Sequence, residues 1–227
     1  TEHGNFEGSS IPNRSRSDED VAAQFRITVE EMRKKLGIAC EKLLAVRSKR
    51  VRPLMDDKVL TSWNALMISA FARASRVFKD PEFEKMATHA ADFIFNNLFD
   101  DFGRLLRRWR DGEARFPAYL CDHAQLSVAC LDLYETTYDP VWFQKAVELS
   151  DKINRLFRCA EGPYYDTGTD GDVLLTRNAE GYDGVEPSGN SSLAHSFLRL
   201  HAYGLAPEYY DDAQRVFESF AAHLEQA

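Results

Sequence analysis

The sequence predicts an all-α fold in which helical hairpins pack side by side as an (α/α) toroid. Apolar residues recur at helical spacing in three pairs of segments, and each pair is joined by a short turn. The pattern also repeats, because a shift of 58 residues aligns residues 95–99 with 153–157 and Asn64 with Asp122. A single hairpin of this length cannot bury its own apolar face, so neighbouring hairpins are expected to stack around a shared core.

The three hairpins are expected at about residues 59–99, 120–157 and 188–224. In each of them the first helix is rich in small and apolar residues, whereas the second carries a polar face. This difference predicts an inner layer of doubly covered helices and an outer layer that faces solvent. About seven helices are too few to close a double ring of six hairpins, so the chain is either a fragment of a toroid or an open arc.

The turns within the hairpins have their own signature. Asp80 precedes Pro81 and Asp139 precedes Pro140, while the third hairpin has Pro207 without an aspartate before it. An aspartate accepts hydrogen bonds from the first free N–H groups of a helix, and proline is tolerated in the first turn. The two Asp-Pro pairs therefore predict where the second helix of each of these hairpins begins.

The N-terminal part of the chain lacks this periodicity. Residues 1–17 are rich in Gly, Ser, Asn and Arg and are expected to form a loop within a polar segment, residues 1–27. Thr28 and Glu31 form a capping-box pattern, which predicts a helix that ends near Arg50. Residues 28–227 are interpreted as part of one toroid domain.

The segments between the hairpins are long and resemble strands. Residues 103–109, 162–165 and 172–176 alternate or cluster β-forming side chains next to glycine and proline. Linkers of this length are usually functional or form small structures of their own. Short β-hairpins over one rim of the toroid are therefore expected.

Composition excludes several classes of function. The formal charge of −8 disfavours a nucleic-acid partner, because phosphates are repelled. No run approaches the roughly 18 consecutive apolar residues of a membrane-spanning helix, so no membrane partner is expected. The four cysteines form no Cys-x-x-Cys pair and no zinc-binding spacing. A cytoplasmic protein without a metal or cofactor is expected, and a mature secreted protein stays open.

Three acids near the starts of the inner helices are the candidate catalytic residues: Asp57, Asp122 and Glu186. Hydrolysis of a glycosidic bond needs two carboxylates, roughly 5 Å apart for retention of configuration and about 6.5 to 9.5 Å apart for inversion. Asp57 is alternatively an N-cap, and Glu186 is alternatively paired with Lys58 or a linker arginine. Asp122 follows an apolar pair and has no evident capping role, so its functional and structural interpretations weigh equally.

Six further residues are candidates for binding substrate: Lys58, Trp63, Asn64, His123, Ser188 and Asn190. An indole offers a flat stacking platform, and an amide both donates to and accepts from hydroxyl groups. Trp63 is alternatively a core residue, Asn64 is alternatively bonded to backbone, and Ser188 and Asn190 are alternatively helix caps.

Histidine suits proton transfer near neutral pH, which an epimerase or isomerase requires. His123 is adjacent to Asp122, but neighbours on a helix point about 100° apart, so the two are not expected to face the same cavity. His195 and His201 are expected in the core. The basic run at residues 107–110 either recognises an anion above the mouth of the toroid or is a solvated strand face.

Several spaced segments resemble the spermatogenesis-associated protein 20 family. The matching segments are residues 52–53 (RP), 56–60 (DDKVL), 63–67 (WNALM), 183–191 (DGVEPSGNS) and 194–201 (AHSFLRLH). The resemblance implies a six-hairpin toroid similar to those of glycosidases and N-acylglucosamine 2-epimerases, of which this chain is the later half. It also implies a thioredoxin-like domain as a partner in the intact protein. The family brings no established reaction.

The function expected from these features is that of a carbohydrate-directed enzyme, in the style of a hydrolase or a 2-epimerase, acting on a sugar-like ligand. Helix N-termini gathered at one rim favour such a ligand, because they present free N–H groups and partial positive charge. The alternative is a scaffold that binds a ligand or client without turnover and works with the thioredoxin-like domain. A third interpretation is a degenerate toroid whose polar residues only cap helices.

Overall fold

The computed structural model describes residues 4–160 and 162–224, which form eight helices and one three-stranded sheet. The chain separates into two compact units, with the boundary between Asp56 and Asp57. Whether residues 28–56 belong to the toroid, as the sequence predicts, stays a prediction. None of the helices in the described ranges is both long and apolar enough to span a bilayer.

The first unit contains α1 (Asp18–Phe25) and α2 (Val29–Arg47). The capping box of α2 is present, since the Thr28 hydroxyl accepts from the Glu31 N–H at 3.1 Å and the Glu31 carboxylate accepts from the Thr28 N–H at 3.2 Å. Helix α1 follows the expected loop of residues 1–17 and lies within the polar segment of residues 1–27. The sequence pattern does not predict this helix, because it is too short to show a helical periodicity. The Ser17 hydroxyl caps its N-terminus.

The second unit consists of three consecutive helical hairpins, as the sequence predicts. They pair α3 (Thr61–Phe78) with α4 (Pro81–Asn97), α5 (Leu120–Thr137) with α6 (Pro140–Leu156), and α7 (Gly189–Ala202) with α8 (Glu208–Leu224). The Asp-Pro turns begin the second helices as expected. The Asp80 carboxylate accepts from the Glu82 N–H, and the Asp139 carboxylate accepts from the Val141 N–H, each at 3.0 Å.

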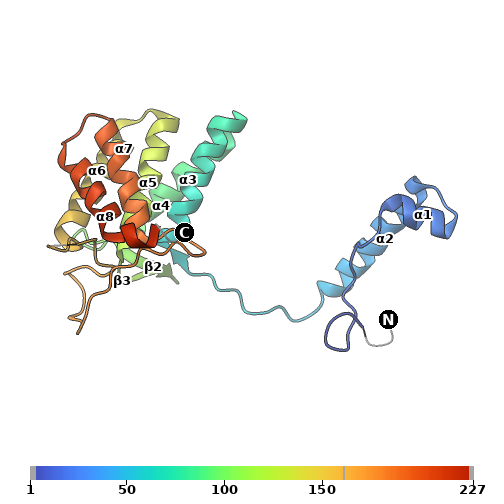
Figure 1. The fold of residues 1–227 in the computed structure, drawn as a ribbon. Coiled ribbons are helices and arrows are strands. Elements are labelled where there is room, and N and C mark those ends of the chain that lie inside the picture. The colour runs from blue at the N-terminus through green and yellow to red at the C-terminus, as the bar shows by residue number, and fades with distance from the viewer. Residues whose placement is uncertain (1–3, 161, 225–227) are drawn as a thin grey trace. The chain divides into compact units, whose positions relative to one another are not determined.

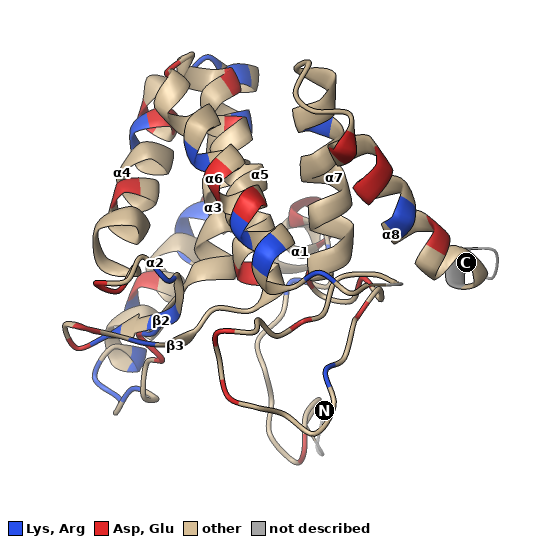
Figure 2. Cartoon of the chain, turned by 90° about the vertical axis from the view of Figure 1, so that its left-hand side faces the viewer, with Lys and Arg blue, Asp and Glu red and all other residues tan. Residues whose placement is uncertain are grey.

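The first helices of the hairpins form an inner layer in which α5 packs between α3 and α7 (Figure 1). Helix α5 is buried on nearly every face, whereas its hairpin partner α6 buries one side only. Figure 2 shows acidic and basic residues spread along α4 and α8. The predicted division into inner and outer helices is therefore present, and the fold is an all-α (α/α) toroid arrangement.

An antiparallel sheet lies at the N-terminal ends of the inner helices. It has the order β1 (Val59–Leu60), β2 (Leu106–Arg110), β3 (Glu113–Pro117), and β1 leads directly into α3. Two contacts fix it to the helices. The Thr61 hydroxyl donates to the Leu106 carbonyl at 2.7 Å, and the Trp109 ring packs edge-on against Phe93 at 5.2 Å.

The predicted strand at residues 103–109 is confirmed by β2, but the strands predicted at residues 162–165 and 172–176 are wrong. Tyr164 forms a single bridge with Arg158, and residues 172–176 have no strand structure. The side chains of Val173 and Leu175 are fully exposed. A strand needs a partner edge for its N–H and C=O groups, and no described segment pairs with these residues.

Helices α5 and α7 approach closely because Gly189 starts α7. A Cβ atom at this position would lie 2.8 Å from Leu120 Cγ and 2.9 Å from the backbone nitrogen of Cys121. The backbone nitrogen cannot move aside as a flexible side chain would. A glycine is therefore required at this contact.

We predict that Gly189→Ala destabilises the second unit by about 1–3 kcal/mol, the usual cost of overpacking a close contact. Urea unfolding followed by tryptophan fluorescence measures this, because Trp63, Trp109 and Trp142 all lie in that unit. Gly162→Ala is the control, since its Cβ would meet only Cys159 Sγ at 3.7 Å. Equal unfolding midpoints for the two variants would contradict the packing role.

Candidate functional site

Asp122 is fully buried at the start of α5 and binds the ends of two inner helices. One oxygen accepts from the backbone N–H of Ser62 in α3 at 3.0 Å. The other accepts from the backbone N–H of Tyr119 at 2.9 Å and from Arg107 Nη1 at 3.0 Å. The expectation that Asp122 has no capping role was wrong, because an acid in the third position of a helix reaches back to the N-cap.

The start of α7 is held in a similar way. The Ser188 hydroxyl caps the helix by accepting from the Ser191 N–H at 3.1 Å. Asn190 is fully buried, and its amide binds the Tyr164 N–H, the Tyr164 carbonyl and the Glu180 carbonyl, each at 2.9 Å. Asn190 therefore fixes the linker that precedes α7, and its binding role stays a prediction.

The candidates around α3 lie on its N-terminal side. Asp57 forms an ion pair with Arg110 at 2.7 Å, and both side chains are nearly half exposed. The capping alternative for Asp57 was wrong, because β1 intervenes and Leu60 occupies the N-cap position. Asn64 donates to the Leu60 carbonyl at 2.8 Å, and Lys58 is exposed. These three candidates lie beside the sheet and in the first turn of α3.

His123 lies in the core and not in an open site. Its Nδ1 is 3.1 Å from the Tyr119 carbonyl, and its ring packs against the edge of Phe157 at 5.0 Å. Burial lowers the pKa of His123 to about 4, so the ring is neutral near pH 7. Glu186 differs from the other two candidate acids, because its Oε2 is buried without a hydrogen-bond partner among the described residues.

A groove of about 370 Å³ lies between α3, α5 and α7. Its lining residues are Leu66, Ser69, Ala70, Arg73, Gln125, Val128, Pro187, Ser191, Ser192 and His195. The four residues from α3 are spaced i, i+3, i+4 and i+7, so they form one face of the helix. This face of the inner layer is the candidate functional site, and none of its lining residues is a candidate selected from the sequence.

Gln125 is the most deeply buried polar residue among the described lining residues of the groove, with 2% of its surface exposed. Its Nε2 donates to the Pro187 carbonyl at 3.1 Å, which fixes the orientation of the amide. Its Oε1 is buried and has no hydrogen-bond partner in the described part of the chain. A buried amide oxygen requires a donor, and this oxygen belongs to a side chain that lines the groove.

His195 lines the same groove from α7. The sequence-based expectation that His195 lies in the core was wrong, because its side chain is exposed. Partial burial, and then the nearby Arg199 and Arg73, lower the pKa of His195. The neutral imidazole can therefore accept a proton at neutral pH. Trp63 is 62% exposed, so its core alternative was also wrong. It lies three residues before Leu66, on the groove face of α3.

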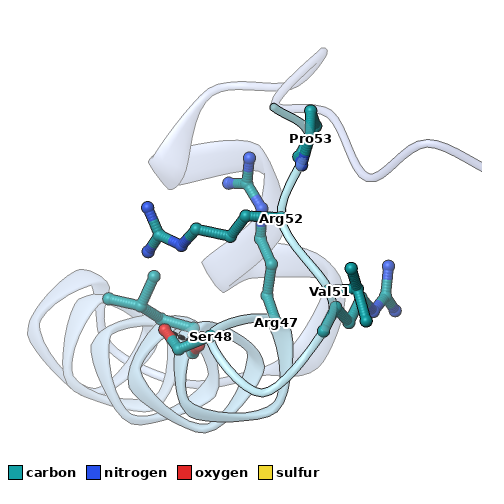
Figure 3. A pocket seen from close by; sticks show the side chains of 7 residues that line it. Arg47, Ser48, Val51, Arg52 and Pro53 are labelled. Carbon is teal, nitrogen blue, oxygen red and sulfur yellow. Dashed lines mark hydrogen bonds between the residues drawn. The ribbon is translucent and has the colours of Figure 1, made fainter. Parts of the chain in front are cut away.

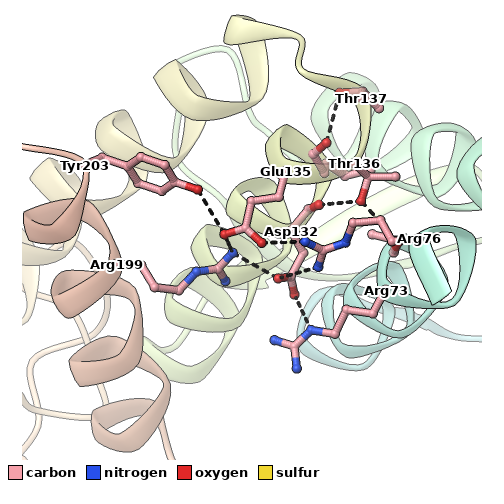
Figure 4. A network of polar contacts seen from close by, with 10 residues as sticks. Arg73, Arg76, Asp132, Glu135, Thr136, Thr137, Arg199 and Tyr203 are labelled. Carbon is pink, nitrogen blue, oxygen red and sulfur yellow. Dashed lines mark hydrogen bonds and ion pairs between the residues drawn. The ribbon is translucent and has the colours of Figure 1, made fainter.

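A network of ion pairs joins the three inner helices beyond the groove (Figure 4). Asp132 of α5 is buried and binds Arg73 Nε at 3.1 Å and Arg199 Nη2 at 3.0 Å. Glu135, one turn later, binds Arg76 Nη1 and Arg199 Nη2, each at 2.6 Å. The network holds Arg73 at the edge of the groove.

The environment of Glu135 favours its charged form. Burial alone would raise the pKa of its carboxyl, but hydrogen bonds from Arg199 and Arg76 outweigh this and lower the pKa to about 2. The Tyr203 hydroxyl donates a further bond at 3.0 Å. Glu135 is therefore ionised throughout the physiological range and fixes α5 against α3 and α7.

A second cavity, of about 400 Å³, lies in the first unit after the C-terminal end of α2 (Figure 3). Arg47, Arg50 and Arg52 contribute to its lining, and every lining residue is exposed. No buried polar group faces it among the described residues. It is an open group of surface arginines and a weaker candidate than the groove.

The groove residues were not selected from the sequence, although a signal was present. Polar side chains such as Ser69, Arg73 and His195 interrupt helices that are otherwise apolar, and they recur at helical spacing. A search for polar stripes on the inner helices, instead of polar helix starts, would have found them.

No protein-family model matches the chain. Spermatogenesis-associated protein 20 of Homo sapiens is 32% identical over 97% of the chain, and the protein of that name from Rattus norvegicus is 32% identical over 98%. The chain spans about 30% of the length of these relatives.

Solved structures share the fold at low sequence identity. A GH76 α-mannanase of Bacteroides thetaiotaomicron has a TM-score of 0.59 at 17% identity, over 75% of this chain and 47% of that one. The cellobiose 2-epimerase of Spirochaeta thermophila has a TM-score of 0.58 at 16% identity, over 73% of this chain and 44% of that one. These neighbours are (α/α) toroids, and the similarity establishes the fold alone.

We predict that Asp122→Ala destabilises the second unit by about 3 kcal/mol or more, because it leaves two helix N–H groups and Arg107 without their partner. Urea unfolding measures this loss. Asp57→Ala is the matched control and should cost less than about 1 kcal/mol, as expected for an exposed ion pair. A small effect of Asp122→Ala would contradict its double capping role.

We predict that Glu135 contributes to acid unfolding. Its pKa is lower when folded, so its stabilisation is present above about pH 4.5 and is lost as the pH falls towards about 2. In Glu135→Gln, the free energy of unfolding should be lower at pH 7 and should depend less on pH in that window. Urea melts across this range test it, with Glu148→Gln on α6 as the control. An unchanged pH dependence in Glu135→Gln would contradict the contribution of this carboxylate to acid unfolding.

Proposed function

We propose a carbohydrate-directed function for this chain. The chain belongs to the spermatogenesis-associated protein 20 family and spans about 30% of the length of the relatives that it matches. The observation that carries the proposal is the groove of the inner layer, in which a buried amide oxygen has no described partner. The fold is one that α-mannanases and cellobiose 2-epimerases also use. The fold alone does not fix a reaction, so the argument depends on the groove.

A sugar-like ligand fits the chemistry of the groove. Its volume of about 370 Å³ lies within the range of small-molecule sites. A sugar hydroxyl can donate to Gln125 Oε1, and the hydroxyls of Ser69 and Ser192 can both donate and accept. The exposed indole of Trp63 lies one turn from Leu66 and can stack on the apolar face of a sugar ring.

The side chains of the groove support proton transfer better than hydrolysis. No aspartate or glutamate is among the described lining residues, whereas His195 can act as a neutral base. Removal of a proton next to a sugar carbonyl places negative charge on the carbonyl oxygen, which the nearby Arg73 guanidinium can stabilise. We therefore favour chemistry of the 2-epimerase type. The catalytic roles of Asp57, Asp122 and Glu186 stay predictions.

One observation favours a second candidate function, a scaffold that binds a ligand without turnover. His195 is the one side chain among the described lining residues that can exchange a proton near neutral pH. Epimerisation needs a proton donor on the opposite face of the reacting carbon as well. In this alternative, the groove presents a ligand or client to a thioredoxin-like domain of the intact protein.

We predict that the full chain exchanges the C2 proton of a reducing hexose in D₂O, and that His195→Gln slows this exchange at least about 100-fold, the usual effect of losing a general base. NMR measures deuterium incorporation, and saturation-transfer NMR measures binding in the same samples. His89→Gln, on the exposed face of α4, is the control and should exchange normally.

The possible outcomes separate the candidates. Binding without exchange in the wild-type chain would support the scaffold and reject the epimerase-type reaction. Exchange that persists in His195→Gln would remove this residue from the mechanism. The absence of both binding and exchange would contradict a carbohydrate-directed function for this chain.

A further inference from the structure

Arg73 combines a fixed position with unused hydrogen-bonding capacity. Its Nε donates to the buried Asp132 at 3.1 Å, which anchors the side chain, yet 52% of that side chain is exposed. A guanidinium has five N–H donors in a rigid fork, and the described residues engage Arg73 only through Nε. The two terminal nitrogens are therefore available at the edge of the groove that Arg73 lines.

The ion-pair network carries a surplus of positive charge. Three guanidinium groups, from Arg73, Arg76 and Arg199, face the two carboxylates of Asp132 and Glu135. One charge is left without a counterpart within the network. The Nη1 atom of Arg199 is buried and has no hydrogen-bond partner among the described residues, which is consistent with more donors than acceptors.

We propose that the groove selects an anionic sugar, in which a carboxylate or phosphate group pairs with Arg73 while a ring hydroxyl donates to Gln125 Oε1. This inference rests on the proposed carbohydrate-directed function and names the class of ligand. A guanidinium fork matches the oxygens of either acid group, so the two share one recognition chemistry.

The charge of the groove contrasts with that of the whole protein. The chain has a formal charge of −8, but Arg73 is the charged residue among the described lining residues, and no acid accompanies it there. Partial burial and the nearby Arg199 and Arg73 guanidinium groups lower the pKa of His195. The lining of the groove therefore carries a positive charge within an acidic protein.

Asp132 does not cancel this charge at the groove. Its side chain is 2% exposed, and its oxygens already face Arg73, Arg76 and Arg199. It acts as an anchor behind the guanidinium, so the terminal nitrogens of Arg73 are oriented before a ligand arrives. Preorganisation of this kind lowers the conformational entropy that binding must otherwise remove.

The test titrates the full chain with glucuronate, glucose 6-phosphate and glucose, and measures the dissociation constants by calorimetry or saturation-transfer NMR. At least one anionic sugar should bind about 10-fold or more tightly than glucose, and comparison of the two anions identifies the acid group. Raising the salt concentration from about 20 to about 200 mM should weaken the binding of the anionic sugar and leave the affinity for glucose unchanged, because salt screens charge pairs.

Arg73→Gln should reduce the preference for the anionic sugar to within about twofold of glucose. Arg76→Gln is the matched control, because Arg76 belongs to the same network and helix but does not line the groove. It should retain the preference. Thermal melts of both variants verify folding, and the salt dependence of the wild-type chain tests the charge even if a variant fails to fold.

Equal affinity for charged and neutral sugars, without salt dependence, would overturn the anionic preference and leave the carbohydrate-directed function intact. Retention of the preference in folded Arg73→Gln would overturn the role of this residue. Binding of none of the three sugars would instead contradict the proposed function itself. The failures of the two proposals are therefore distinguishable.

Discussion

The burial of α5 between α3 and α7 is the constraint on which the rest of the structure depends. A helix covered on nearly every face must satisfy its polar groups through its neighbours, since water does not reach them. Asp122 does this at the N-terminal end by binding the backbone of α3 and the Arg107 side chain. Asp132 does it towards the C-terminal end by binding arginines from α3 and α7. Two acids of one helix thus hold the inner layer together.

This constraint divides the polar residues of the inner helices into two groups. Asp122 and Asn190 bind backbone groups of other segments and have become part of the scaffold. Gln125, His195 and Arg73 line the groove, and the described hydrogen bonds use only part of the capacity of Gln125 and Arg73. The same ion pairs that fix α5 also orient Arg73. In the proposed function, structural support and ligand recognition are therefore coupled through a single network.

The relation to sugar-active toroids defines the architecture and leaves the chemistry to the side chains. At 16–17% identity, the shared feature is the fold of inner and outer helices, and in this chain the groove lies on one face of the inner layer. Such a face can carry different polar residues without a change of fold, because those residues are not needed in the core. In this chain it carries a histidine and an arginine, with no acid among the described lining residues. This set of residues motivates both proposals.

The sequence by itself determined the three hairpins, the Asp-Pro turns, the capping box and the inner and outer layers. These features follow from contacts within a few residues, which periodicity and capping chemistry describe. Only the tertiary structure decided that Asp122 binds Ser62, which lies 60 residues away, while Gln125 buries an oxygen without a described partner. It also decided that residues 172–176 find no strand partner. A polar side chain shows its chemistry in the sequence, but its partners depend on how distant helices pack.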